Sequence, residues 1–249
     1  MKRLVLLGVF ALSACGSSGG GGGSAAPPAP TPTPIANTSS PHYLPLANGN
    51  SWTFASGGKM VDMGSSTLSC GCPGNGDTME RIALYPPGSS TISSSFFFTK
   101  TPPSGQYGEL SNIVGVENDS GTSNVTVISN VQFPNGVPVM DDSPSANEFW
   151  NDGAGDQSTI TSVGGTLMLP SGSEVIDVAE DQITGSFSSI TWDFARGVGF
   201  TQIGVGGQST TLTSFSVNAA SSMVRTSASH VRGEPGTIDF EHSLAALFK

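Results

Sequence analysis

Two cysteines separated by a single glycine are the most reactive side chains in the middle of the chain, Cys70-Gly71-Cys72. In an exported protein these thiols would oxidise to a disulfide. The bond would be structural or, because its small ring is strained and easily reduced, redox-labile. Thioethers from three nearby methionines would add soft ligands for Cu(I). These methionines are Met60, Met63 and Met79. We favour the disulfide, because oxidation competes with thiolate–metal binding outside the cytosol.

Five acidic residues crowd a segment rich in Gly, Ser and Pro: Asp141, Asp142, Glu148, Asp152 and Asp156. Carboxylates on a flexible loop are the hard oxygen ligands that Ca²⁺ prefers. Their spacing matches no EF-hand, and acidic loops are usually just solvated. Asp141, Asp142, Asp152 and Asp156 are therefore calcium candidates without a recognised motif, and no cofactor is predicted.

The three histidines are His42, His230 and His242, and none has the sequence context of a catalytic triad or a zinc site. Carboxylate pairs such as Glu180-Asp181 occur in glycosidases. Pairs of this kind are also common by chance in any acidic chain. We expect a protein that is not an enzyme, with no catalytic residue assigned.

The first residues carry the pattern of an export signal. Lys2-Arg3 is positively charged, and residues 4–12 form an apolar run that is too short to span a bilayer. The run ends in Leu12-Ser13-Ala14-Cys15, which resembles a bacterial lipobox. This resemblance implies a signal peptide over residues 1–14 and a lipidated Cys15 as the mature N-terminus. The alternative is plain secretion with cleavage near Ala14, which would leave Cys15 a free thiol.

The position after Cys15 bears on the membrane address. Gly16 stands there, whereas Asp at this position favours retention in the inner membrane of Gram-negative bacteria. The resemblance therefore implies an outer-membrane lipoprotein held by acyl chains such as palmitate. Either face of that membrane is compatible with the sequence.

A spacer follows the cysteine. Residues 16–24 are almost entirely Gly and Ser, and residues 25–34 alternate Pro with Ala and Thr. Such segments form a flexible coil and a stiffer extended spacer, with nothing to bury. We predict a tether over residues 15–42.

Composition limits the partners of the chain. Hydrophobic residues make up 36% and charged residues only 11%, with a formal net charge of −10. An acidic domain without clustered basic residues repels phosphate backbones, so no nucleic-acid partner is expected. The abundance of Gly, Ser and Thr suits strands and turns rather than long solvated helices.

Short apolar runs separated by Gly, Pro and Asn predict the secondary structure. Strands are expected at residues 51–55, 81–85, 91–99, 113–117, 124–133, 158–163, 166–169, 174–179, 183–194, 199–205 and 209–217. This pattern predicts an all-β single domain of antiparallel sheet, curved or sandwiched, over residues 43–236. Residues 237–249 are expected to form a short C-terminal helix, beginning at a Thr237 cap.

Several stretches resemble a broad class of uncharacterised bacterial lipoproteins. The opening Tyr43-Leu44-Pro45-Leu46 followed by Gly49-Asn50-Ser51-Trp52-Thr53-Phe54 is similar to their Pro-Leu, Gly-Asn-x-Trp-x-aromatic motif. The later Trp192-Asp193-Phe194-Ala195-Arg196-Gly197-Val198-Gly199 resembles their Trp-x-aromatic-Ala-x-Gly-Val-Gly hairpin. Asp193 and Arg196 depart from the hairpin pattern. A third stretch, Pro170–Val178, is similar to their Pro-Ala-Gly-x-aromatic-x-x-Val strand, and Val175 stands there in place of the aromatic residue. The class implies a β-sheet domain and a lipid anchor, and it implies no activity.

The residues of these motifs have a structural interpretation. Spacing of two places Trp52 with Phe54, and Trp192 with Phe194, on one face of a strand, so we expect core anchors. Gly197 and Gly199 are expected to allow a tight hairpin. The alternative is that the tryptophan rings stack on a ligand.

The sequence leaves two functions open. One is a carrier whose curved sheet encloses a lipid or a small hydrophobic ligand. The other is a surface interaction or adhesion module that meets an envelope protein through a sheet edge or loops. In both, the membrane is contacted through the N-terminal lipid.

Overall fold

The computed structural model describes residues 42–67, 78–101, 110–117, 137–151, 155, 157–185, 189–218 and 240–249. All of them belong to one compact unit, Pro32–Lys249. Within these ranges twelve strands form one antiparallel sheet, and a short helix follows at the C-terminus. The predicted all-β single domain is confirmed.

The strands follow one another along the chain and vary in length from 3 to 12 residues. They are β1 (Ser51–Phe54), β2 (Lys59–Thr67), β3 (Thr78–Tyr85), β4 (Ser94–Thr101), β5 (Leu110–Glu117), β6 (Val137–Met140), β7 (Phe149–Asn151), β8 (Gln157–Met168), β9 (Glu174–Thr184), β10 (Ile190–Ala195), β11 (Gly199–Val205) and β12 (Gln208–Ser216).

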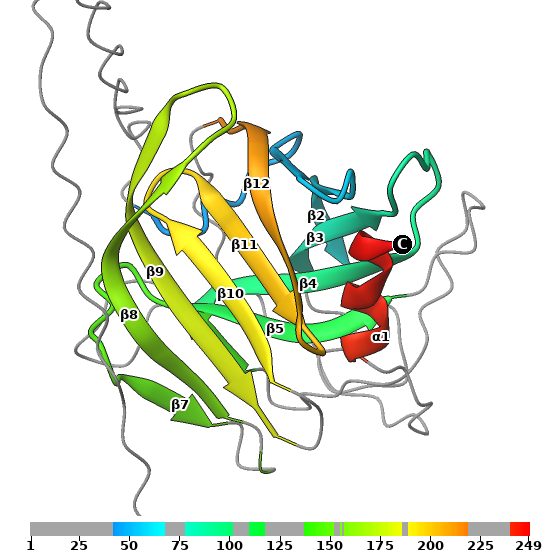
Figure 1. Cartoon of the computed structure of the whole chain (residues 1–249). Coiled ribbons are helices and arrows are strands. Elements are labelled where there is room, and N and C mark those ends of the chain that lie inside the picture. The colour runs from blue at the N-terminus through cyan, green and yellow to red at the C-terminus, as the bar shows by residue number, and fades with distance from the viewer. Residues whose placement is uncertain are drawn as a thin grey trace, which may run out of the picture. The chain divides into compact units, whose positions relative to one another are not determined.

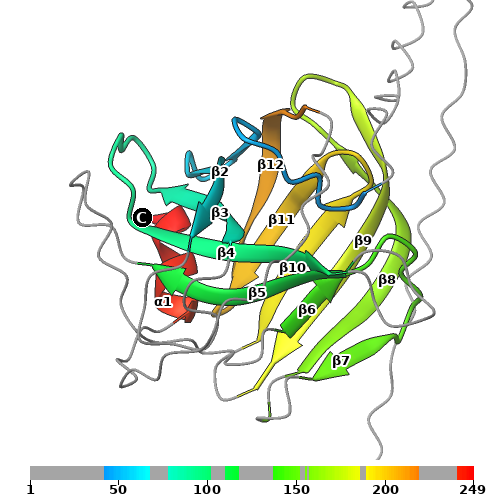
Figure 2. The same ribbon diagram turned by 180° about the vertical axis from the view of Figure 1, so that it is seen from behind.

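The strand order is a meander that runs outward and then back. From β1 the chain adds β2 to β6 in turn on one side, then restarts at β7 on the opposite edge and returns to β12, which pairs with β1. The sheet folds over on itself, since β6 contacts β7, β8 and β9. Figures 1 and 2 show β2–β5 crossing on one side of β8–β12, so the two halves form two layers.

The hydrophobic core lies between these layers. In β10 buried Ile190, Trp192 and Phe194 alternate with partly exposed Thr191 and Asp193. This period of two is what a strand shows when one of its faces is covered. The largest fully buried side chains are Trp52, Trp192, Phe54, Phe96, Phe98, Phe194, Phe200, Leu44, Met60 and Met79.

The C-terminal helix is short and held by packing. It consists of α1 (Phe240–Ala245) and one 3₁₀ turn, η1 (Ala246–Phe248), and buries Leu244 and Leu247 completely. A Cβ added at Gly58 would lie 2.6 Å from the carbonyl oxygen of Leu247, so the helix backbone rests directly on the sheet there. A helix this short needs such contacts to persist. No helix in the described ranges is long and apolar enough to cross a membrane.

Several predicted strand bounds are wrong. The sequence predicts no strand at β2, β6 or β7, because polar residues and a glycine interrupt β2, and β6 and β7 are very short. The two strands predicted at residues 158–169 are one, β8, which continues through bulges around Gly164, where φ is +73°. The strand predicted at residues 183–194 is the end of β9 and most of β10. The one predicted at residues 124–133 lies outside the described residues.

Candidate functional site

The four rings predicted as core anchors lie between the two layers. Trp52, Phe54, Trp192 and Phe194 are each at most 1% exposed. Trp52 meets Phe200 edge-on at 5.1 Å between ring centroids, and Trp192 lies 5.2 Å from the same ring. The indole N–H of Trp52 donates a hydrogen bond of 2.6 Å to the carbonyl oxygen of Val198. These contacts bury the rings among one another and leave none of the four available to stack on a ligand at the surface.

Of the predicted hairpin glycines, Gly197 lies in the turn between the antiparallel strands β10 and β11, and Gly199 is the first residue of β11. Gly197 and Gly199 have φ values of 72° and 94°, a region that side chains rarely adopt. A Cβ added at Gly199 would also stand 2.7 Å from the indole nitrogen of Trp52. Glycine at this position is therefore required both by the backbone and by the ring packed against it.

An ionic cluster forms where the chain enters the domain, and we call it the chain-entry cluster. Its members are His42, Tyr43, Asp142, Asp177 and Arg196. The Arg196 Nε and the Tyr43 hydroxyl each donate to the Asp177 carboxylate at 2.7 Å. The guanidinium also lies 4.4 Å from the centre of the Tyr43 ring. Arg196 thereby links β9 to the segment that precedes β1.

Asp142 completes this cluster. Its carboxylate contacts His42 Nδ1 at 2.6 Å and accepts the Tyr43 backbone N–H at 3.2 Å. The backbone carbonyl of His42, which the sequence places at the end of the tether, accepts a hydrogen bond of 2.7 Å from the Gly197 N–H. These three contacts bind the end of the predicted tether to the folded domain.

Burial and the hydrogen bonds of the chain-entry cluster shift the pKa values of two of its members, Asp177 and Tyr43. Burial tends to raise the pKa of Asp177, but the hydrogen bonds from Tyr43 and Arg196 outweigh burial and lower that pKa. Burial and the neighbouring Asp177 raise the pKa of the Tyr43 hydroxyl. Asp177 stays ionised and Tyr43 stays a donor at neutral pH. In the sequence Arg196 stands out only as a departure from a family motif, and nothing there indicates its partners.

The calcium candidates do not come together in the described residues. Asp142 belongs to the chain-entry cluster, whereas Asp141 is buried and accepts the Ser143 backbone N–H at 2.7 Å. Burial raises the pKa of Asp141. No group of three or more His, Cys, Asp or Glu side chains in the described ranges is arranged to hold a metal ion. Asp152 and Asp156 lie outside those ranges, and so do Cys15, Cys70 and Cys72, for which the lipid and the disulfide stay predictions.

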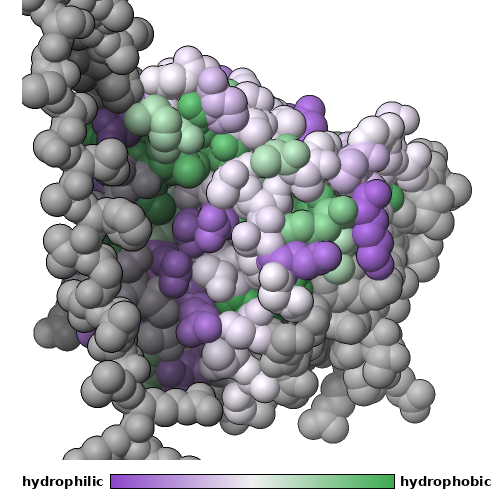
Figure 3. Space-filling model, in the orientation of Figure 1, coloured by the Kyte–Doolittle hydropathy of each residue, from purple (hydrophilic) through white to green (hydrophobic). Residues whose placement is uncertain are grey.

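A polar groove of about 370 Å³ lies on the outer face of β9–β12, and we call it the outer groove. The side chains that give it its polar character are Glu180, Ser189, Thr191, Gln202, Gln208 and Ser209. On the face seen in Figure 3, hydrophobic residues gather at the upper left, and the middle carries mostly pale and hydrophilic ones.

The strand register explains why the outer groove is hollow. Gly204 pairs with Thr191 on β10 and with Ser209 on β12, so one cross-strand row lacks a side chain in its middle. A Cβ added at Gly204 would lie 3.4 Å from the Thr191 Cβ and would occupy this space. The β11–β12 turn that closes the row is Gly206-Gly207, both with positive φ, as a two-residue hairpin turn requires.

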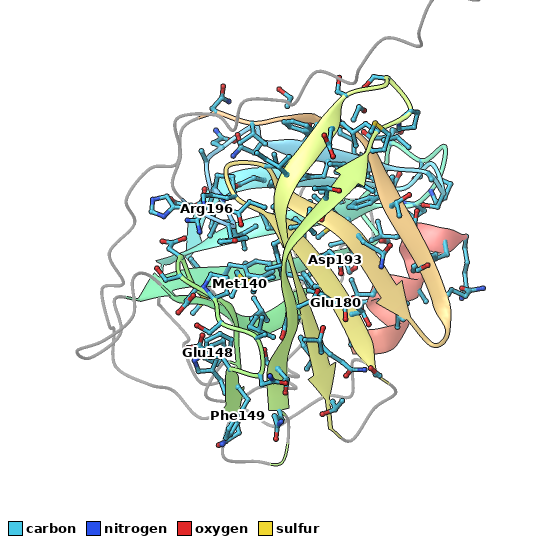
Figure 4. The ribbon with its side chains drawn as sticks, turned by 60° about the vertical axis from the view of Figure 1, so that its left-hand side comes forward. Met140, Glu148, Phe149, Glu180, Asp193 and Arg196 are labelled. Atoms are coloured by element: carbon cyan, nitrogen blue, oxygen red, sulfur yellow. The ribbon has the colours of Figure 1, made fainter. Side chains whose placement is uncertain are left out.

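Two carboxyl groups stand side by side in the next row. Asp193 pairs with Glu180 on one side and Gln202 on the other, and Figure 4 shows Asp193 and Glu180 on neighbouring strands. Thr161 donates a hydrogen bond to Glu180, and Asp193 Oδ1 is buried with no hydrogen-bond partner among the described residues. Burial and the charge of Glu180 raise the pKa of Asp193 to about 7. Like charges directly opposite each other destabilise a sheet, so this pair costs folding free energy.

Comparisons with protein-family models, curated proteins and solved structures found no match.

The chemistry of the outer groove is that of hydrogen bonding. Its lining combines hydroxyls, amides and the Glu180 carboxylate, and none of the described lining residues is a His or Cys that could form a nucleophile–base pair. The groove can therefore hold a polar ligand by hydrogen bonds. The sequence contains one hint of it, since Gln202 and Gly204 alternate with apolar residues in β11 as Thr191 does in β10. Only the strand register shows that these positions lie side by side.

Further acidic side chains are buried away from this groove. Asp62 and Glu80 are 1% and 2% exposed on the neighbouring strands β2 and β3. Burial and the charge of Glu80 raise the pKa of Asp62 to about 8. Asp181 is fully buried, accepts the Ser158 hydroxyl at 2.6 Å, and has its pKa raised well above its usual value by burial. Burial disfavours the charged form of the Asp62 and Asp181 carboxyls and keeps both away from any ligand at the surface.

Proposed function

We propose that this protein is a lipid-anchored component of the bacterial envelope and that its domain acts as a surface interaction module. The domain binds its partner through its outer surface, without catalysis and without enclosing a ligand between its layers. Of the two functions that the sequence leaves open, this is the one that the geometry supports better.

The observation that carries the proposal is the packing between the layers. A carrier of lipid or hydrophobic ligand needs an apolar cavity of several hundred Å³. The equivalent space here holds the indoles of Trp52 and Trp192 together with Phe96, Phe98 and Phe200, all at 0% exposure. Rings packed at centroid distances of 5.1–6.1 Å leave no room for an acyl chain among them. This packing supports a mode of binding in which the ligand stays outside the core.

The anchoring half of the proposal rests on sequence. The Leu12-Ser13-Ala14-Cys15 pattern follows an apolar run of signal-peptide type, and a Gly/Ser- and Pro-rich segment follows it. Three acyl chains on one N-terminal cysteine hold a protein almost permanently, at ~0.8 kcal/mol per buried CH₂. The tether would let the domain reach partners beyond the lipid surface.

Metabolic labelling tests the anchor. Cells that express the protein with radioactive palmitate should label the wild type and leave Cys15→Ser unlabelled, with the variant in the soluble fraction. Cys70→Ser is the matched control and should be labelled like the wild type. A labelled Cys15→Ser protein, or wild type found in the cytosol, would contradict the proposal.

An environment-sensitive apolar dye tests the surface mode of binding. 1-N-phenylnaphthylamine should show no saturable fluorescence increase with the folded domain, because the core has no room for it. Trp192→Ala, which opens a cavity, serves as the positive control. Saturable binding of the dye to the wild type, displaced by a fatty acid, would favour the carrier function instead.

A further inference from the structure

We propose that the outer groove is a binding site for a neutral saccharide. The inference deepens the proposed function, since it names the class of ligand that the surface module takes. It rests on the shape, the hydrogen-bonding groups and the charge of the groove.

The shape fits a small ring. The missing side chain at Gly204 produces a hollow between Thr191 and Ser209, bordered at one end by the Gly206-Gly207 turn. Its volume of about 370 Å³ falls at the lower end of the ~300–1,000 Å³ typical of small-molecule sites. Because the hollow lies on a strand-paired sheet, the backbone beneath its lining side chains is held by hydrogen bonds and needs little ordering when a ligand enters.

The hydrogen-bonding groups match a ligand that both donates and accepts. Gln202 and Gln208 each offer an amide N–H₂ and a carbonyl oxygen, and the serine and threonine hydroxyls also act in both roles. Glu180 adds a carboxylate that can accept from two hydroxyls. Sugar hydroxyls on neighbouring carbons present this mixture of donors and acceptors. A purely cationic ligand would use the acceptors alone and leave the amide donors unpaired.

The charge of the groove excludes anions. Glu180 is the one ionisable residue of the described lining, and Asp193 stands directly beside it. The whole chain is acidic, at −10. A phosphate, sulfate or uronate would be repelled both by the nearest carboxylate and by the field of the protein. Neutral sugars meet no such penalty.

Asp193 has a positioning role in this site. Its carboxyl lies between Glu180 and Gln202 in the cross-strand row, and its Oδ1 is enclosed. In its protonated form Asp193 removes the like-charge repulsion that would push the Glu180 carboxylate away from the sheet. Glu180 and Gln202, the two side chains of this row that reach the ligand, therefore both depend on Asp193 for their positions.

NMR titration of the ¹⁵N-labelled domain tests the proposal. We expect cellobiose and N,N′-diacetylchitobiose to shift, in a saturable manner, the backbone amides of Gly204 and Gly207 and the side-chain amides of Gln202 and Gln208. A sulfated disaccharide and spermidine, added as anionic and cationic probes, should leave these signals unmoved.

Three variants complete the experiment. Gly204→Val fills the hollow at a position with ordinary backbone φ and should abolish the shifts. Glu180→Gln should weaken binding about tenfold, as the loss of a charged hydrogen bond does. Ser214→Val changes an exposed residue of β12 outside the groove and should bind like the wild type.

A pH series tests the positioning role of Asp193. The disaccharide affinity of the wild type should fall between pH 6 and pH 8, as Asp193 loses its proton beside Glu180. Asp193→Asn keeps the shape of the side chain without its charge and should bind equally at both pH values. A wild-type affinity that does not change over this range would remove Asp193 from the site.

The outcomes separate this inference from the proposed function. Absence of shifts with both neutral disaccharides, shifts produced by spermidine or the sulfated sugar instead, or shifts that survive Gly204→Val would each overturn the saccharide site. None of these results affects the surface mode of binding, which fails only if the interior takes up an apolar ligand.

Discussion

At the scale of single residues, the contact of Gly199 with Trp52 joins the two halves of the sheet. The indole N–H donates to the Val198 carbonyl, 146 positions later in the chain, and the ring is met by a glycine with a positive φ. A residue near the start of the domain is in this way fixed by a turn near its end. The contact accounts for the glycine at position 199, where an added Cβ would clash with the indole.

Replacement of Trp52 by Ala should lower the free energy of unfolding by about 3–5 kcal/mol, because it leaves a large cavity and an unpaired carbonyl at Val198. Urea denaturation followed by circular dichroism measures the loss. Trp150→Ala removes a tryptophan that is only partly buried and should cost less. An unchanged midpoint for Trp52→Ala would mean that the ring is not a core anchor.

Asp62 makes stability depend on pH in an unusual direction. Its pKa rises from 3.8 to about 8 on folding, so the folded state keeps a proton that the unfolded state releases. The stability associated with this proton is fully present below about pH 4 and is lost as the pH rises toward 8. Asp193, with its pKa raised to about 7, acts in the same sense.

We therefore expect the melting temperature to be higher at pH 5 than at pH 8. Asp62→Asn, which keeps the acceptor for the Gly64 N–H, should raise the melting temperature at pH 8 and flatten this slope. Asp177→Asn is the control. The pKa of Asp177 is lowered on folding, so the stability that its carboxylate contributes is lost only in acid. The dependence of the melting temperature on pH between pH 5 and pH 8 should therefore be the same in this variant as in the wild type. A steeper slope in Asp62→Asn would contradict the assignment.

At the scale of elements, the C-terminal helix depends on one close approach. Gly58→Ala would place a Cβ 2.6 Å from the Leu247 carbonyl oxygen, and a backbone atom cannot rotate away. We expect this variant to melt at a lower temperature and to increase amide exchange in α1. Gly165→Ala, whose Cβ would make an ordinary 3.4 Å contact with the Val178 carbonyl, is the matched control. Equal melting temperatures of the two variants would show that the helix does not depend on Gly58.

The chain-entry cluster also holds a whole segment, residues 42–44, against the domain. Arg196→Ala should speed amide exchange at residues 42–44, because Tyr43 loses its ring contact and Asp177 loses its cation. The cost in stability should be small, about 0–1 kcal/mol, since this ion pair is partly exposed. Hydrogen exchange with mass spectrometry distinguishes this local effect from global unfolding, which would accelerate all peptides alike.

Elements with clear alternation can be predicted from the sequence, and interrupted ones cannot. β11 is predicted with its observed bounds, since Phe200, Ile203 and Val205 are bracketed by glycines. β2 is not predicted, because Asp62 and Gly64 break the hydrophobic alternation. Asp62 is buried by pairing with β3, and that pairing is a tertiary fact.

The outer groove could not be predicted from the sequence. It depends on Gly204 lying opposite both Thr191 and Ser209, and register of this kind is set by turns and bulges. The carboxyl pair that is adjacent in the sequence, Glu180-Asp181, points to opposite faces of β9: Asp181 is buried and Glu180 borders the groove. The partner of Glu180 is instead Asp193, on the next strand.

At the scale of the whole molecule, the domain is a solid body of two layers, which we propose is carried on a lipid-anchored tether. The meander brings β12 back beside β1 and β6 against β8, so aromatic rings from both halves share one core. Among the described residues these rings fill the space between the layers, which supports the proposed binding of a partner at the outer face. The acidic charge of the chain disfavours contact with anionic lipid.

The decisive experiment is mass spectrometry of the protein purified from its own envelope. We predict a chain that begins at Cys15, carries covalent acyl groups and releases no additional lipid when it unfolds. A native mass that exceeds the denatured mass by that of a lipid, lost on unfolding, would contradict the solid core and the surface mode of binding.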